Sequence, residues 1–165
     1  MEAASGTGPA TLAPGLNGSA LDLLSAALRA VEAWDLPALA DLVTDDAVFV
    51  DPHYPVTRMV GRAAISDGLR WAFGTMDALR FETVLGFESG DGRHAAVEVD
   101  CDHLLRGGRR LAFRQVFVAD VRDGRIARLQ AYEPYGPGGL VGLVLRATRL
   151  GRRLRWLGRH RPSGR

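Results

Sequence analysis

The fold is decided by residues 79–132, which read LRFETVLGFESGDGRHAAVEVDCDHLLRGGRRLAFRQVFVADVRDGRIARLQAY. Apolar and polar side chains alternate along four segments of this stretch, which is the period of half-buried β-strands. Short glycine-containing turns separate these segments at residues 90–92, 107–108 and 122–124. Strands joined by such short turns pair with their neighbours in an antiparallel meander. The stretch therefore predicts one curved sheet.

The residues before the sheet predict three helices. Apolar side chains recur at helical spacing from Ser19, and a second short helix follows. A short β run at residues 47–50 and a loop at residues 53–59 precede a third helix, which Gly74 ends. Helices that cover one face of a curved sheet make an α+β fold. We expect a cone with an apolar pocket between the two layers, the kind of site that binds small molecules.

Length and composition indicate a single globular domain. The chain has 165 residues, of which 47% are hydrophobic and 24% are charged. No apolar stretch reaches the roughly 18 residues of a membrane span, which argues against an integral membrane protein. Cys101 is the only cysteine, so no internal disulfide is expected, and the N-terminus has no secretory signal pattern. We therefore expect a cytoplasmic protein.

Charge is distributed unevenly along the chain. Residues 140–165 contain eight arginines and no acid, although the formal net charge of the whole chain is only +2. The other 13 arginines stand against 19 acids in residues 1–139, which gives this part a net charge of −6. Residues 1–17 are rich in Gly, Ala and Pro and predict a disordered arm. We expect a folded domain at 18–135 and a linker with a basic tail at 136–165.

The tail predicts a basic amphipathic helix. Its apolar stripe contains Leu143, Ala147, Leu150, Leu154 and Leu157, with arginines opposite and beside it. Such a helix can lie on an anionic membrane surface, here through residues 140–159, or dock on a partner or on the acidic body. The first of these would give a peripheral membrane location. Nucleic acid is a poor candidate partner, because no recognised motif or interleaved aromatic residues accompany the arginines.

Several short strings, in this order and spacing, resemble the nuclear-transport-factor-2-like superfamily and especially its SnoaL-like branch. They are Trp34-Asp35-Leu36, Thr44-Asp45-Asp46-Ala47-Val48-Phe49, Asp51-Pro52, Gly61-Arg62-Ala63-Ala64-Ile65 and Val121-Arg122-Asp123-Gly124-Arg125-Ile126. The resemblance covers roughly residues 20–135 and implies a cone-shaped, cystatin-like roll. The superfamily contains ketosteroid isomerase, polyketide cyclases, epoxide hydrolases and dehydratases, together with members that only bind ligands or proteins. The resemblance therefore implies a fold without settling an activity.

Asp51 is the candidate catalytic residue. In ketosteroid isomerase, which the chain resembles here, an aspartate in the same Asp-Pro context is the general base. The alternative is structural, because an aspartate before proline often accepts local backbone N–H groups. The tyrosine of the isomerase oxyanion hole corresponds to Ala27, and its protonated aspartate falls near Gln115. Isomerase chemistry by that arrangement is therefore not expected.

The remaining site residues are expected to line the pocket. They are His53, Tyr54, Trp71, Cys101, His103, Phe113, Gln115, Phe117 and Tyr132. The alternatives are a core position for Trp71 and Cys101 and a half-exposed position for His103 near the end of its strand. Gln115 lies between phenylalanines, and a buried amide must find a partner because leaving it unpaired costs about 1–3 kcal/mol.

Other classes of site are poorly supported by the sequence. Its four histidines lack metal-ligand spacing, and it has no phosphate loop or dinucleotide fingerprint, so no metal or cofactor is expected. Arg114 with Asp100 and Asp102 resembles the epoxide hydrolase set, but strand alternation places all three on the outer face.

Two hypotheses for the function remain open. One is an enzyme that performs general acid–base chemistry on an apolar, oxygenated molecule, of the isomerase, cyclase or dehydratase type. The other is a non-catalytic binding or interaction domain. A homodimer is expected in either case, because the outer sheet face carries four apolar residues, Ala96, Ala112, Val116 and Val118.

Overall fold

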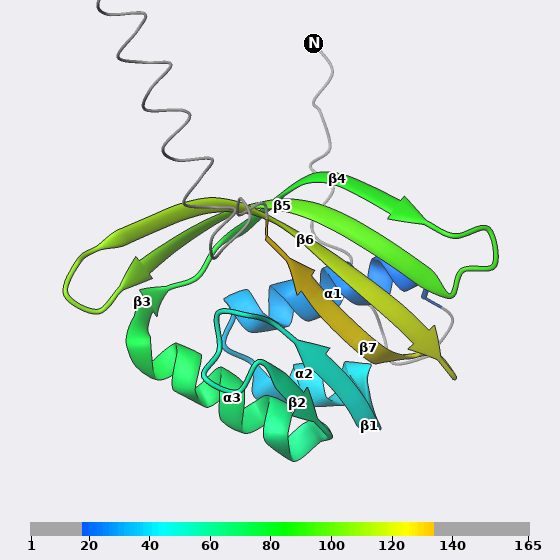
Figure 1. Ribbon diagram of the computed structural model, residues 1–165. Coiled ribbons are helices and arrows are strands. Elements are labelled where there is room, and N and C mark those ends of the chain that lie inside the picture. Colours follow the sequence, from blue (N-terminus) through cyan, green and yellow to red (C-terminus); the bar gives the residue numbers. More distant parts are fainter. Residues whose placement is uncertain (1–17, 134–165) are drawn as a thin grey trace, which may run out of the picture. The chain divides into compact units, whose positions relative to one another are not determined.

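The computed structural model describes residues 18–133 (Figure 1). The predicted arm at 1–17 and the predicted tail at 136–165, with its amphipathic helix at 140–159, lie outside the described residues. The described residues up to Tyr132 belong to one unit, which contains all the features below. Within the described part, none of the helices has the length and apolar character needed to cross a bilayer.

Three helices form where the sequence predicts them. They are α1 (Ala20–Glu32), α2 (Leu36–Leu42) and α3 (Arg62–Thr75). The Ser19 hydroxyl accepts a backbone N–H of the first turn of α1 at 3.2 Å, and the Asp35 carboxylate does the same for α2 at 2.9 Å. These side chains satisfy donors that the first turn of a helix leaves without partners. The polar residues before each apolar stripe thus fix where the first two helices begin.

Seven strands form one curved sheet. They are β1 (Val43–Val50), β2 (Arg58–Val60), β3 (Met76–Ala78), β4 (Phe81–Glu88), β5 (His94–Leu105), β6 (Arg110–Arg122) and β7 (Arg125–Tyr132). The order is β2-β1-β7-β6-β5-β3, and β4 also pairs with β5. The pairs are antiparallel except β1 with β7, which is parallel. The sheet curves over α1 on its helical side (Figure 1), so the predicted α+β cone is confirmed.

The structure differs from the prediction at several boundaries. Strand β1 begins at Val43, directly after α2, rather than at residue 47, and α3 continues through Gly74 to Thr75. Strands β2 and β3 were not expected, and β2 occupies part of the predicted loop at 53–59. Each has three residues, too few for alternation to be visible in the sequence.

The inner face of the sheet follows the alternation on β5. Val97, Val99, Cys101 and His103 are all buried against the helical layer. On β4 the alternation fails, because the pairing with β5 shifts register between Thr83 and Leu85. A bulge of this kind redirects the following side chains, and Leu85 becomes 47% exposed. The core is therefore built mainly on the helices and on strands β1, β5, β6 and β7, with no fully buried hydrophobic residue from β4.

Candidate functional site

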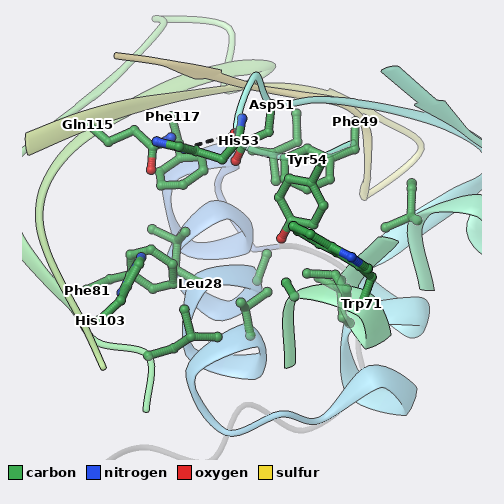
Figure 2. Close-up of a pocket in the computed structure, with 18 of the residues that line it drawn as sticks. Leu28, Phe49, Asp51, His53, Tyr54, Trp71, Phe81, His103, Gln115 and Phe117 are labelled. Carbon is green, nitrogen blue, oxygen red and sulfur yellow. Dashed lines mark hydrogen bonds and ion pairs between the residues drawn. The ribbon is translucent and has the colours of Figure 1, made fainter. Parts of the chain in front are cut away.

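A cavity of about 360 Å³ lies between the helices and the inner face of the sheet (Figure 2). Its wall is mostly apolar, with contributions from α1, α3 and the central strands. A small number of polar side chains interrupt this wall, namely Asp51, His53, Tyr54, Thr75, His103 and Gln115. An apolar enclosure with a few placed polar groups is the usual form of a small-molecule site.

Asp51 follows β1 and is only 5% exposed. Its backbone N–H donates to the carbonyl of Thr57 at 2.9 Å, which closes the loop that follows the strand. Its carboxylate Oδ1 accepts the backbone N–H of His53 at 2.9 Å and lies 3.2 Å from His53 Nδ1. Asp51 thus makes the local backbone contact of the structural alternative and also lies on the cavity wall. The two roles are compatible.

Two residues of the same loop also line the cavity. The His53 ring lies 5.0 Å from the ring of Phe113, and the Tyr54 ring packs 5.7 Å from Phe49. Burial raises the pKa of the Tyr54 hydroxyl, and the negative charge of Asp51 raises it further. Tyr54 is therefore a neutral hydrogen-bond donor, and Figure 2 shows its hydroxyl directed toward the cavity.

Trp71 lies on α3 across the cavity from the central strands (Figure 2). Its ring is 6.1 Å from that of Tyr54, and the residue is 47% exposed. The core position considered for Trp71 is therefore wrong. It forms part of the cavity wall while one side faces solvent.

His103 lies on β5 and is buried, so the half-exposed alternative is wrong. Its ring is 5.3 Å from Phe81 and 5.3 Å from Phe113, in both cases edge to face. Burial is the main cause that lowers its pKa, with the backbone of Asp102 acting in the opposite direction. His103 Nδ1 makes no hydrogen bond of acceptable geometry with any residue that the structure describes. It is a neutral imidazole in an aromatic wall.

Gln115 lies on β6 and is 2% exposed. The Cys101 thiol donates to Gln115 Oε1 at 3.6 Å. The amide nitrogen Nε2 is buried and has no hydrogen-bond partner in residues 18–133. The amide thus keeps an unused donor in the wall of an apolar cavity.

Eight of the ten predicted site residues line the cavity, and two do not. Cys101 is buried beside Gln115 and is not part of the cavity wall. Tyr132 pairs with Val116, which places it on the outer face, where it is 47% exposed and accepts a hydrogen bond from Arg128. The expectation that Tyr132 caps the pocket is therefore wrong, because its position in the register of β7 faces away from the helices.

The outer face carries the charged residues that resemble an epoxide hydrolase set. The Arg114 guanidinium binds Asp100 through two hydrogen bonds of 2.8 and 3.0 Å and lies 3.1 Å from Glu98. Asp102 pairs with Arg110 on the same face. The predicted solvated, cross-strand ion pairs account for these residues, and none of them lines the main cavity.

Most of the cavity wall was not singled out in the sequence. Its apolar members include Leu28 and Val31 of α1, Leu69 of α3, and Phe81 of β4. The helical spacing marks the first three as buried, but burial against a neighbour and burial against a cavity give the same pattern.

Comparisons with known proteins place this geometry in a family. The model of the SnoaL-like domain matches residues 24–129, whereas no curated protein matches the chain. Among solved structures, a Δ5-3-ketosteroid isomerase from Mycobacterium sp. is similar at 24% identity and a TM-score of 0.62, over 70% of this chain and 93% of that one. RV0760c from Mycobacterium tuberculosis, in complex with estradiol-17β-hemisuccinate, is similar at 22% identity and a TM-score of 0.63, over 70% and 94%.

A third solved structure, of a candidate polyketide cyclase from Pseudomonas putida KT2440, is similar at 21% identity and a TM-score of 0.61. It covers 73% of this chain and 93% of that one. Likeness at these identities reflects a shared fold. The family match extends from α1 to β7 and includes every strand that shapes the cavity. The chain is therefore a member of the SnoaL-like domain family, within the nuclear-transport-factor-2-like superfamily.

Proposed function

We propose that this protein binds an apolar, oxygenated small molecule in the cavity and that Asp51 acts on it as a general base. The observation that carries the proposal is a cavity of about 360 Å³ whose apolar wall contains one buried carboxylate, that of Asp51. Apolar burial supplies the affinity, and the few polar groups orient the bound molecule.

The chemistry open to this site is proton transfer next to a carbonyl group. The Asp51 carboxylate would take a proton from the carbon beside the carbonyl, and the electron pair of the broken C–H bond would move to the carbonyl oxygen. Returning the proton to another carbon completes an isomerisation. Attack of the enolate carbon on a second carbonyl carbon of the same molecule, with the π electron pair moving to that carbonyl oxygen and the proton from Asp51 added there, completes a cyclisation. The Tyr54 hydroxyl is a neutral donor in the same cavity and is suited to stabilise the negative oxygen.

A second candidate function is ligand binding without catalysis. One observation favours it: the cavity presents the methyl group of Ala27 and the amide of Gln115 where the resemblance to ketosteroid isomerase would require a tyrosine and a protonated aspartate. An amide is a weaker donor to an enolate than a carboxylic acid. Turnover at any rate that depends on Asp51 would exclude this alternative.

Two interactions of the protein are part of the proposal. We propose a homodimer through the outer sheet face, where Val116 and Val118 are half-buried and Tyr132 adds an exposed ring. We also propose that residues 140–159 attach the protein to an anionic membrane surface in the cytoplasm, because their leucines and arginines suit the interfacial zone.

A thermal-shift screen tests ligand binding first. Steroids, aromatic polyketides and terpenoid epoxides are added at increasing concentration, and the melting temperature is measured. A ligand that binds only the folded state raises the melting temperature with concentration. A compound that saturates this shift is then incubated with the protein and followed for conversion. A screen in which no class shifts the melting temperature would contradict the proposal.

A further inference from the structure

Two buried polar atoms in the cavity wall have no hydrogen-bond partner among the described residues. They are Nε2 of Gln115, in a side chain 2% exposed, and Nδ1 of His103, in a side chain 6% exposed. Both residues line the cavity, and Figure 2 shows them on the same wall, across from Tyr54 and Trp71. A buried polar group without a partner is costly, so its presence in a folded protein needs an explanation.

The two atoms are held at separate points rather than at one. In the β5–β6 register Gln115 pairs with Val99, and His103 lies four residues further along β5. Four residues of an antiparallel strand span roughly 14 Å between Cα atoms, so one ligand atom does not serve both side chains. Phe113 occupies the wall between them, with its ring 5.3 Å from that of His103.

The hydrogen-bonding character of each point is also defined. Gln115 Oε1 accepts from the Cys101 thiol, and the unpartnered atom of the amide is Nε2, whose N–H groups can only donate. His103 is a neutral imidazole, because burial lowers its pKa, and its Nδ1 donates or accepts according to tautomer. Along this wall, the amide donor of Gln115 is followed by the ring of Phe113 and then by the imidazole nitrogen of His103.

We infer that the ligand is a flat, apolar molecule with a hydrogen-bonding oxygen at each of two opposite ends, one bound by Gln115 and the other by His103. The apolar middle of such a molecule lies against Phe113. This inference rests on the proposed cavity as a ligand site and specifies the class of ligand. Molecules with one oxygen leave one of the two buried groups without a partner and bind less tightly.

Two sets of simple compounds test the inference. The first set is naphthalene, 2-naphthol and 2,6-dihydroxynaphthalene, and the second is biphenyl, 4-hydroxybiphenyl and 4,4′-dihydroxybiphenyl. A hydroxyl group both donates and accepts, so it matches either point whatever the tautomer of His103. Dissociation constants are measured for the full-length protein. In at least one set, each hydroxyl group should tighten binding by about tenfold, the gain expected for partnering a buried polar group.

Two variants test which residue is responsible for the affinity gained from each hydroxyl group. Gln115→Met and His103→Phe replace each polar side chain with an apolar one of similar shape. Each should remove the affinity gain from one hydroxyl group, while the affinity for the hydrocarbon stays about the same. Gln130→Met and His94→Phe are matched controls, because they change the same residue types on the same sheet at positions that do not line the cavity. Both control variants should show the same gain in affinity from each hydroxyl group as the wild type.

The outcomes separate the inference from the proposed function. Hydrocarbons that bind while neither set gains affinity from hydroxyl groups would overturn the inference and leave the cavity as an apolar ligand site. The inference would also be overturned if the hydroxyl groups gave the same gain in affinity in Gln115→Met and His103→Phe as in the wild type. If no compound of either set binds, the cavity is not a ligand site for apolar molecules, and the proposed function fails together with the inference.

Discussion

His53 holds the carboxylate of Asp51 through two contacts to a single oxygen. Oδ1 of Asp51 accepts the backbone N–H of His53 at 2.9 Å and lies 3.2 Å from Nδ1 of the His53 ring. With one oxygen engaged in this way, the side chain is fixed in one orientation at the cavity wall. A general base needs such positioning, because proton transfer requires contact between the base and the proton it removes.

Asp51→Asn should reduce turnover while leaving the stability of the fold almost unchanged. Asparagine keeps the oxygen that accepts the His53 N–H, so the melting temperature should change little. Any turnover found should fall by about a hundredfold or more, the usual contribution of a general base. Asp67→Asn, on the exposed surface of α3, is the control and should leave the rate unchanged. An unchanged rate in Asp51→Asn would remove Asp51 from the mechanism.

His103 should make stability depend on pH in the acid range. Its pKa is lowered in the folded state from the ordinary value of 6.5, so the unfolded chain binds a proton first as pH falls. The free energy of unfolding should therefore decrease as pH falls below about 6.5, until the folded state also takes up the proton.

Urea unfolding at a series of pH values measures this contribution. Carboxylates also contribute to acid unfolding, so the wild type is compared with His103→Phe, in which they are retained. The wild type should lose more stability than the variant between about pH 7 and pH 5. Equal losses in the two proteins would mean that His103 is not held neutral by burial.

The sequence predicted most of the sheet because its signal there is local. Alternation along β5 and β6 identifies which side chains face inward, and this placed His103 and Gln115 on the inner face. The parallel pairing of β1 with β7 joins residues about eighty positions apart, and no local pattern encodes it. The short strands β2 and β3 likewise have too few residues to alternate visibly.

The sequence predicted a site residue correctly only where a side chain that faces inward also borders the cavity. Cys101 and Gln115 both face inward, yet only Gln115 reaches the cavity, because the curvature of the sheet decides which inward side chains meet open space. Tyr54 follows no periodicity, and its buried hydroxyl depends on the fold of the loop after Asp51. Tyr132 was misplaced because its pairing with Val116 cannot be read from its own strand.

Val116→Asp should weaken the proposed homodimer. Val116 lies on the outer face opposite Tyr132 in the β6–β7 pair, so a charge there would be buried in an interface without a partner. Sedimentation at tens of micromolar, on the order of the concentrations that resolve weak interfaces, should show a dimer for the wild type and a monomer for the variant. Val56→Asp, in the exposed loop between β1 and β2, is the control and should remain dimeric. A monomeric wild type would rule out the interface.

Removal of residues 140–165 should abolish binding to anionic vesicles. Each arginine near an anionic surface contributes about 1 kcal/mol, and this segment has eight of them. The last described strand ends at Tyr132, so the shortened protein should keep its melting temperature. Binding of the full chain should weaken as salt is raised, because salt screens the attraction. A shortened protein that is insoluble would show instead that the leucines of the tail belong to the core.

The central claim is that the cavity binds apolar small molecules, and filling the cavity tests it most directly. N-phenyl-1-naphthylamine is an uncharged probe whose fluorescence rises in apolar surroundings, and its emission is titrated against three proteins. Ala72 lines the cavity and Ala63 is exposed on the same helix, so Ala72→Phe fills the cavity while Ala63→Phe makes the same change outside it. The account predicts saturable binding to the wild type and to Ala63→Phe, with none to a folded Ala72→Phe protein. Equal binding to all three proteins, or no binding to the wild type, would contradict it.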